Sequence, residues 1–312
     1  MLEISSRTIR ADFHRWFDRI PDIDAASWYM ISDYCVGDNN KQNDAFSFAI
    51  LLNHDTSENI ASYIARVAPK DIKESRGAWQ GLLDYLSCPV SFSVNFVVER
   101  QTSYLKSILT VEAMRDVTDD LRKIVRGWAT EEPSNGPYYD ILDRRLKLLA
   151  SELASKNPSL KLLRRIFLVA SFAAIVLTVV NDSKSPIHIR WISDRDAMFD
   201  RHDGVAFDLG WLLFQLTRRK NHSWIDLRRP QIGFATPGMD GKTEYAEFVR
   251  LPDILAGTLA DMRVPQMMFT HPKFPPAFNR LFVNSQNNAV IEIVSSLESV
   301  KARRITFGEQ RA

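Results

Sequence analysis

The sequence predicts an α/β fold in which a mixed sheet of about five strands is flanked by helices. Short apolar runs with a period of two, typical of strands, alternate along the chain with longer runs of helical spacing. The chain has 312 residues, of which 45% are hydrophobic and 25% are charged, an ordinary globular composition. Because neither a repeat nor a low-complexity linker interrupts it, we expect a single domain over residues 1–312.

Strands are expected where apolar residues alternate with polar ones, or run together between turn formers. The expected strands cover residues 27–32, 45–52, 90–98 and 187–193, with an edge strand at 67–73 as a further candidate. A polar loop at 37–44 joins the first two strands, which indicates an antiparallel hairpin. We expect the strands at 27–32, 90–98 and 187–193 to run parallel at the centre of the sheet.

Helices are expected where apolar residues recur every three or four positions. They cover residues 7–20, 57–67, 74–86, 103–130, 138–155, 161–180, 205–217, 248–262 and 284–300. A core over about 27–262 would thus carry a large helical insertion at about 103–180, and residues 263–312 would form a C-terminal extension. The most hydrophobic run, 166–180, is shorter than the about 20 residues of a membrane span, so we expect a buried helix and no membrane segment.

The few cysteines and scattered histidines argue against a disulfide-stabilised protein and against a zinc protein. Cys35 and Cys88 are too few for a disulfide framework, which indicates a reducing compartment. The six histidines show no zinc-binding spacing.

The first residues contain no apolar secretion signal, so we expect a cytoplasmic protein. The net charge of +2 favours a polyanionic partner only weakly.

Acidic residues stand at the ends of several expected elements. Asp33, Glu99 and Asp194 directly follow expected strands, and Asp253 lies in the first turn of a late helix. The carboxyl ends of strands in an α/β sheet are where such folds place ligands and chemistry. Asp196, two residues after Asp194, is an alternative to it. We therefore expect these acids to meet at one edge of the sheet.

Clustered carboxylates repel one another and lose solvation, a cost that a bound divalent cation reverses. Oxygen ligands favour Mg²⁺ or Mn²⁺ over zinc. The sequence therefore predicts a Mg²⁺ or Mn²⁺ site with Asp33, Asp194 and Asp253 as ligands, and Asp196 as a further candidate ligand. Asp33, Asp194, Asp253 and Glu99 are the candidate catalytic residues.

Each acid also has a purely structural explanation, which the sequence leaves open. Asp33 could begin the polar loop, and Asp194 could cap a turn through its own backbone. Asp253 is favoured near a helix N-terminus by the helix dipole alone. Glu99 could be a solvated strand end paired with Arg100.

Three motifs resemble those of the RNase H-like superfamily: a hairpin with Asp after its first strand, an acid after a later strand, and a helix that opens on Asp. More narrowly, the chain resembles the bacterial and phage family called domain of unknown function 3800, over about residues 27–262. The motifs lie at 28–33, 192–196 and 249–257, of which the last is the most specific. Tyr34 and Cys35 stand where the family has Glu and Ser, and Pro252 stands where it has alanine.

The resemblance implies a metal-dependent nuclease or strand-transfer enzyme acting on DNA or RNA. Two metal ions about 4 Å apart would clamp the attacking and leaving oxygens. Basic runs at 218–220, 228–229 and 301–304 could contact phosphates, with Trp211 or Trp224 available for stacking, and His202 could assist proton transfer. The altered first motif favours an alternative, in which the same core is a binding or sensing protein of bacterial defence or a mobile element.

Overall fold

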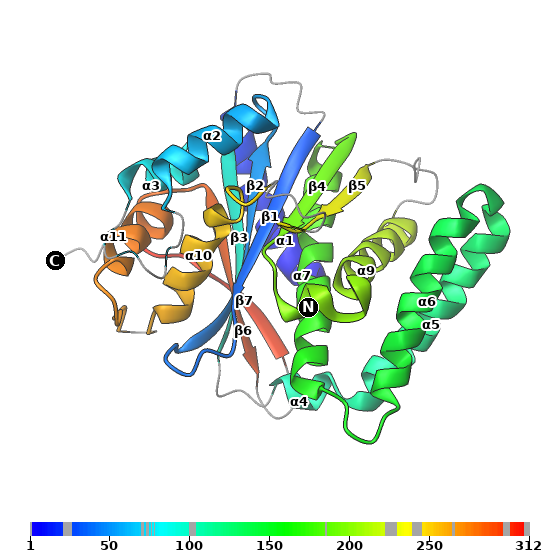
Figure 1. Ribbon diagram of the computed structural model, residues 1–312. Coiled ribbons are helices and arrows are strands. Elements are labelled where there is room, and N and C mark those ends of the chain that lie inside the picture. The colour runs from blue at the N-terminus through cyan, green and yellow to red at the C-terminus, as the bar shows by residue number, and fades with distance from the viewer. Residues whose placement is uncertain are drawn as a thin grey trace. The chain divides into compact units, whose positions relative to one another are not determined.

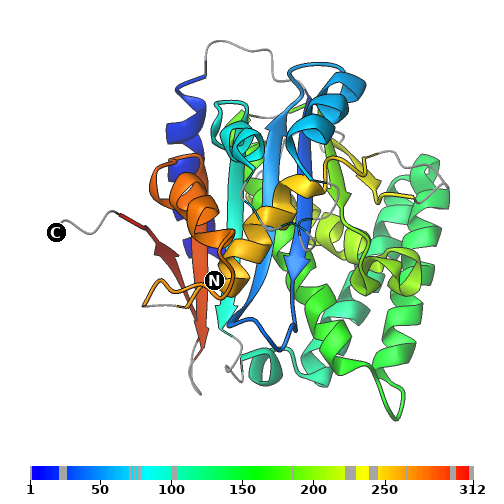
Figure 2. The same ribbon diagram turned by 60° about the vertical axis from the view of Figure 1, so that its left-hand side comes forward.

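The computed structural model describes residues 2–20, 27–69, 72, 75, 77, 79–99, 104–184, 186–221, 230–238, 245–263, 266–295 and 300–308. They form an α/β fold in which helices flank a seven-stranded mixed sheet (Figures 1 and 2). The α/β class is therefore confirmed, and the sheet has seven strands where about five were expected.

The chain divides into two compact units, each described here by itself. The sheet unit comprises Met1–Thr102, Ile175–Asp194 and Ile225–Ala312, and the helical unit comprises Ser103–Ala174 and Arg195–Trp224. The helical unit begins at the residue where the sequence placed the start of the insertion. The expectation of a single domain with these boundaries stays a prediction.

The strands of the sheet follow the order β5–β4–β1–β2–β3–β6–β7. Their bounds are β1 (Ser27–Cys35), β2 (Asn43–Leu52), β3 (Ser91–Glu99), β4 (His188–Ser193), β5 (Gln231–Ala235), β6 (Asn288–Ser295) and β7 (Val300–Ile305). β1 pairs antiparallel with β2, which confirms the expected hairpin, and β2 pairs antiparallel with β3. β4 pairs parallel with both β1 and β5. β1, β3 and β4 therefore run in the same direction, but β2 separates β1 from β3.

Two expectations about secondary structure were wrong. The final helix expected at 284–300 is instead β6, which pairs parallel with β3 and antiparallel with β7. Its run of Val290, Ile291 and Ile293 is β-branched, and such residues pack well on a pleated surface. At the expected edge strand 67–73, the described residues are the end of a helix followed by bends and turns, and the remaining residues lie outside the described part.

One face of the sheet is covered by α2 (Ser57–Val67), α3 (Gln80–Ser87), α10 (Arg250–Asp261) and α11 (Phe274–Phe278), followed by a π-helical turn at Asn279–Val283 (Figure 1). α10 is the central cover, and nine of its residues are buried. Side chains alternate between the faces of a strand. Because Ile31, Ala49, Val97 and Ile192 belong to the core beneath α10, odd-numbered residues of β1, β2 and β3 and even-numbered residues of β4 share this face.

The opposite face carries α1 (Leu2–Phe17), which Figure 2 shows across the sheet from α10. Phe13 of α1 packs its ring 5.8 Å from that of Trp28 and 5.5 Å from that of Phe92, centroid to centroid. Arg10 of α1 forms an ion pair of 2.6 Å with Asp182, near the end of α7 (Leu160–Lys184). Aromatic packing therefore holds α1 on this face, and the ion pair joins α1 to the last residues of α7.

By length and composition alone, α7 could cross a membrane, and it is the one such helix among the described residues. Most of its apolar stretch is buried inside the protein, as in the core helix of a globular fold. The expectation that residues 161–180 form a buried helix is confirmed.

The remaining helices belong to the helical unit. They are α4 (Tyr104–Ile108), α5 (Val111–Glu131), α6 (Gly136–Leu153), α8 (Ala197–Asp200) and α9 (Val205–Asn221), with single 3-10 turns at Pro133–Asn135 and Arg201–Asp203. α5 and α6 pack together through apolar residues that include Leu121 and Leu142. Asp208 of α9, 1% exposed, accepts hydrogen bonds of 3.1 and 3.3 Å from Arg145 of α6. Burial raises the pKa of Asp208 to about 6, and the Arg145 charge opposes that rise.

An acid introduced into α7 tests its burial. Ala174 is 2% exposed, so Ala174→Asp places an unpaired charge in the interior and should lower the free energy of unfolding by about 3 kcal/mol or more. Ala65→Asp on the exposed side of α2 is the control and should cost little. Chemical denaturation measures both variants. Equal stability of Ala174→Asp and wild type would contradict the buried position.

The Asp208 carboxyl should make the protein less stable as the pH rises. Its folded pKa of about 6 exceeds its ordinary 3.8, so the folded state binds the proton more tightly between these values. At about 1.4 kcal/mol per unit, the free energy of unfolding should fall by about 3 kcal/mol from pH 3 to 8. Asp208→Asn should remove this component. Asp143→Asn is a control of opposite sign, because Arg122 and Arg126 lower the pKa of Asp143. Identical pH profiles of wild type and Asp208→Asn would refute the assignment.

Candidate functional site

Asp33 lies within β1 and not after it, because the strand continues to Cys35. Tyr34 and Cys35 pair with Phe46 and Ala45 of β2 and so extend the ladder beyond the expected end at residue 32. Asp33 follows Ile31 on the face beneath α10, and its side chain is half-buried. The backbone N–H of Tyr34 donates to the Asp33 carboxylate at 2.7 Å.

Asp194 and Asp253 are brought to the same place by two different contacts. Ser32 pairs with Ser193 in the parallel ladder, so the next residues, Asp33 and Asp194, lie level with each other. The Asp194 N–H donates to the Ser32 carbonyl at 2.9 Å. α10 lies on β1 and β2, and Asp253 is in its first turn. Three acids that are distant in sequence therefore meet on one face of the sheet.

The electrostatics of Asp33 reflect this meeting. Burial is the largest cause that raises the pKa of the Asp33 carboxyl well above its ordinary value, followed by the negative charges of Asp253 and Asp194. Asp33 and Asp253 also form a side-chain hydrogen bond, which requires a proton on one carboxyl and raises the pKa further. The N–H of Tyr34 opposes the shift. We call Asp33, Asp194 and Asp253 the acidic cluster.

The acidic cluster does not have the geometry of a formed metal site. Among the residues that the structure describes, no three His, Cys, Asp or Glu side chains are grouped so that they could hold a metal ion. Asp33 and Asp253 are instead hydrogen-bonded to each other. A shared proton is how two close carboxyl groups relieve their repulsion without a cation.

Two further polar residues occupy the same level of the sheet. Asp33 pairs with Ser47 of β2, and Ser47 pairs with Asn95 of β3, so the three lie in one row on the face beneath α10. Ser47 and Asn95 are both 0% exposed. Neither the Ser47 Oγ nor the Asn95 Oδ1 has a hydrogen-bond partner. Neither residue could be identified from the sequence, because only the strand register relates Ser47 and Asn95 to Asp33.

Glu99, the fourth expected catalytic acid, is not part of the acidic cluster. It is the last residue of β3, pairs with Asn43 and is exposed. Asn95 is the residue of β3 level with Asp33, and Glu99 lies four residues further, about 13 Å along the strand. Because β2 separates β3 from β1, the two strand ends do not meet as expected.

Asp196 and His202 lie in the helical unit, where both have local partners. Asp196 caps α8 by accepting a hydrogen bond of 2.8 Å from the N–H of Met198. The Nε2 of His202 lies 2.7 Å from a carboxylate oxygen of Glu152, which also pairs with Arg201 at 2.7 Å. These contacts give Asp196 and His202 structural roles within that unit.

The expected phosphate-binding residues are mostly paired, buried or outside the described residues. Arg218 is 2% exposed, while Arg303 and Arg304 pair with Glu292 and Asp12. Trp224 and the basic pair at 228–229 lie outside the described residues. Within the helical unit, Trp211 packs against Trp128 at a ring distance of 5.9 Å.

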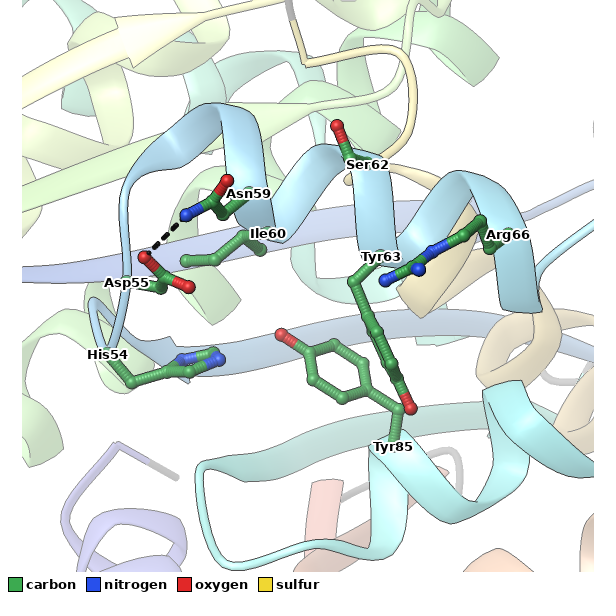
Figure 3. A pocket seen from close by; sticks show the side chains of 8 residues that line it. All are labelled: His54, Asp55, Asn59, Ile60, Ser62, Tyr63, Arg66 and Tyr85. Atoms are coloured by element: carbon green, nitrogen blue, oxygen red, sulfur yellow. Dashed lines mark hydrogen bonds between the residues drawn. The ribbon is translucent and has the colours of Figure 1, made fainter.

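Two surface pockets of the sheet unit, among the residues that the structure describes, are lined by residues other than the acidic cluster. The first, of about 540 Å³, lies at α2 and α3 (Figure 3). The ring of Tyr85 lies between those of His54 and Tyr63, at centroid distances of 6.1 and 5.0 Å. The second, of about 570 Å³, lies at the beginnings of β1, β4 and β5 and is lined in part by His188 and Arg190.

No model of a known protein family, no curated protein and no solved structure matches the chain. The resemblance to the RNase H-like superfamily and to the domain of unknown function 3800 therefore stays a prediction. The site is defined by its geometry alone: three acids of the sheet unit meet beneath and beside α10, and a row of buried polar groups extends from one of them.

Replacing the Asp33 carboxyl, which the folded state disfavours in its charged form, should stabilise the metal-free protein. The raised pKa of Asp33 means that the folded state binds the carboxyl proton more tightly than the unfolded state does. The Asp33 carboxyl therefore lowers the free energy of unfolding by an increasing amount as the pH rises from 3.8 through the folded pKa. Asp33→Asn should therefore melt above wild type at pH 7 in EDTA and lose that pH dependence. Asp55→Asn is the control, because hydrogen bonds from Asn59 and Thr56 lower the pKa of Asp55. A lower melting temperature for Asp33→Asn would contradict the repulsion described.

Proposed function

We propose that the acidic cluster binds Mg²⁺ or Mn²⁺ and that the protein is a nuclease or a strand-transfer enzyme acting on nucleic acid. The observation that carries this proposal is the convergence of Asp33, Asp194 and Asp253 from two parallel strands and one helix. Nothing in the hydrophobic core requires three acids at one place, and their repulsion costs stability. Such costs are concentrated at functional sites.

The donor atoms of the acidic cluster, though not their present geometry, match the preference of a hard divalent cation. Carboxylate oxygens are the ligands that Mg²⁺ and Mn²⁺ prefer. Asp33 and Asp253 would release their shared proton on binding, and Asp194 would complete the set from the end of β4. A bound cation would polarise a phosphoryl oxygen and activate water.

The arrangement of the five strands β3–β2–β1–β4–β5 supports an RNase H-like core as the finer description of the fold. It combines the hairpin, the acid on its first strand, the acid after a parallel strand and the helix that opens on Asp253, all of which the resemblance requires. On this proposal, β6 and β7 are additions at the β3 edge, and residues 103–174 are an insertion between β3 and β4. A cytoplasmic location remains part of the proposal.

The replaced residues of the first motif do not obstruct the acids. Tyr34 points to the opposite face of β1, where its hydroxyl donates to the Ser32 Oγ at 2.6 Å. Cys35 packs against the core beneath α10. The Tyr34 side chain therefore lies on the face opposite to the Asp33 carboxylate.

A binding or sensing protein without catalysis is the second candidate. The observation that favours it is the hydrogen bond between Asp33 and Asp253, together with the missing ligand geometry among the described residues. This candidate predicts that nucleic acid binds without being cleaved.

Metal binding should raise the melting temperature of wild type. A ligand that binds only the folded state stabilises it by about 2.7 kcal/mol at a hundredfold excess over its Kd. Wild type should melt higher in Mn²⁺ than in EDTA, and Asp194→Asn should lose most of that response. Glu99→Gln is the matched control, because Glu99 lies outside the acidic cluster, and it should respond like wild type. Differential scanning fluorimetry measures all three proteins.

The same three proteins test cleavage. Labelled single- and double-stranded DNA and RNA should be cut in Mn²⁺ by wild type and Glu99→Gln but not by Asp194→Asn. Full metal-dependent cleavage by both Asp33→Asn and Asp194→Asn would overturn the assignment. A Mn²⁺ response and nucleic-acid binding without any cleavage would favour the binding or sensing protein.

A further inference from the structure

The pocket at the beginnings of β1, β4 and β5 has a lining that is rich in cationic groups and hydrogen-bond donors. Its volume of about 570 Å³ lies within the range of about 300–1,000 Å³ that is typical of small-molecule sites. Arg190 and His188 line it together with the polar side chains of Asn53, Ser57 and Gln231. No Asp or Glu is among the described residues of this lining. The pocket therefore favours an anion.

The strand register gathers these groups on one face of the sheet. Residues two apart in a strand share a face, so His188 and Arg190 lie on the same face as Ile192 of the core beneath α10. In the parallel ladder, Gln231 of β5 is level with His188, and Gly233 is level with Arg190. A Cβ at Gly233 would meet no atom within 4 Å, so the space beside Arg190 is open.

Arg190 is held in place without being neutralised. Its Nη1 donates a hydrogen bond to the Tyr245 hydroxyl, and its guanidinium carbon lies 5.3 Å from the centre of the Tyr245 ring. Tyr245 has a φ of 69°, a left-handed conformation that costs energy in a non-glycine residue, and such residues are concentrated at functional sites. Among the described residues no carboxylate pairs with Arg190, whereas Arg280 of the same unit pairs with Asp84. The exposed guanidinium therefore keeps its charge for a ligand.

The beginning of α2 adds a second source of positive potential. Ser57 is the first residue of this 11-residue helix, and its Oγ lies 2.7 Å from the Tyr29 hydroxyl oxygen at the pocket. The first N–H groups of a helix have no intrahelical acceptor, and the helix dipole makes this end electropositive. Phosphate groups bind at such ends for this reason. Because α2 and β4 are separate elements, donors border the pocket from more than one side.

We propose that this pocket binds the phosphate group of a phosphate monoester. Such a group carries a charge of about −1.5 to −2 at pH 7 and three acceptor oxygens, which match a guanidinium, an imidazole and several neutral donors. A carboxylate has one charge and two oxygens and would leave part of the lining without a partner. The ester is a small sugar phosphate or the terminal phosphate of a nucleic acid, since both present the same group.

This inference does not depend on the acidic cluster. Along β1 and β4, the core residues Ile31 and Ile192 lie between the pocket and the acids on the same face of the sheet. Binding of the phosphate group therefore requires neither a metal ion nor cleavage.

Isothermal titration calorimetry of the whole protein with ribose 5-phosphate, in EDTA, tests the pocket. Arg190→Gln removes a charge-assisted hydrogen-bond donor and should raise the Kd about tenfold or more. Gly233→Leu fills the open space while all charges remain, and it should weaken binding in the same direction. Arg66→Gln is the matched control, because Arg66 also lies over a tyrosine ring, 5.6 Å from that of Tyr63, but lines the other pocket. Gly308→Leu is the control for the glycine, because Gly308 also has open space beside it and lies outside the pocket.

Two oligonucleotides distinguish the sources of the phosphate group. One is a single-stranded DNA with a 5′-phosphate, and the other is the same DNA without it. If the natural ligand is a nucleic-acid end, the phosphorylated DNA should bind more tightly than both ribose 5-phosphate and the other DNA, and Arg190→Gln should remove this preference. If the natural ligand is a small ester, ribose 5-phosphate should bind at least as tightly as the phosphorylated DNA.

The outcomes separate this inference from the proposed function. Saturable binding of either phosphorylated probe, weakened by Arg190→Gln and Gly233→Leu but not by the two controls, would support it. It would be overturned if wild type bound neither phosphorylated probe, or if Arg66→Gln weakened binding as much as Arg190→Gln. If ribose 5-phosphate does not bind, equal binding of the two DNAs would also overturn it. The Mn²⁺ response of the melting temperature belongs to the acidic cluster alone, so either proposal can fail without the other.

Discussion

The parallel pairing of β1 with β4 is the interaction on which the sheet unit depends. It places Ile192 beside Ile31 in the core beneath α10, and it places Asp194 level with Asp33. Side chains alternate along a strand, so a slip of one residue would turn Asp194 to the other face and move Trp191 beneath α10. The same ladder therefore determines both the packing of the core and the position of the acids.

Much of the sheet could be predicted because its strands carry a strong local signal. Apolar alternation located β1 to β4 to within a few residues, and the turn formers at 37–44 identified the hairpin. The order of the strands could not be read in this way, because pairing depends on contacts between distant segments. The sequence analysis mistook β6 for a helix, because the short run of Val290, Ile291 and Ile293 fits the period of a helix as well as that of a strand. Only its pairing between β3 and β7 shows that this run is a strand.

The meeting of the acids could be predicted where it depends only on neighbouring strands that run in the same direction. Asp33 lies near the carboxyl end of β1 and Asp194 directly follows the parallel strand β4, so the general placement of ligands at carboxyl ends applied to them. The same argument failed for Glu99, because an antiparallel strand separates β3 from β1 and β3 continues past the level of Asp33. Ser47 and Asn95 were invisible in the sequence, since a serine and an asparagine in apolar strands become neighbours of Asp33 only through the register.

The long separation of the three acids along the chain has a consequence for biosynthesis. β1 leaves the ribosome early, but its partner β4 follows only after the helices α4 to α7, and α10 follows later still. During translation, β1 and β2 therefore form part of an incomplete sheet whose apolar face is not yet covered. Exposed apolar surface of this kind makes a folding intermediate prone to aggregation. Asp253 arrives on the helix that finally covers this face, so a nascent chain remains without its assembled site until the fold itself is nearly complete.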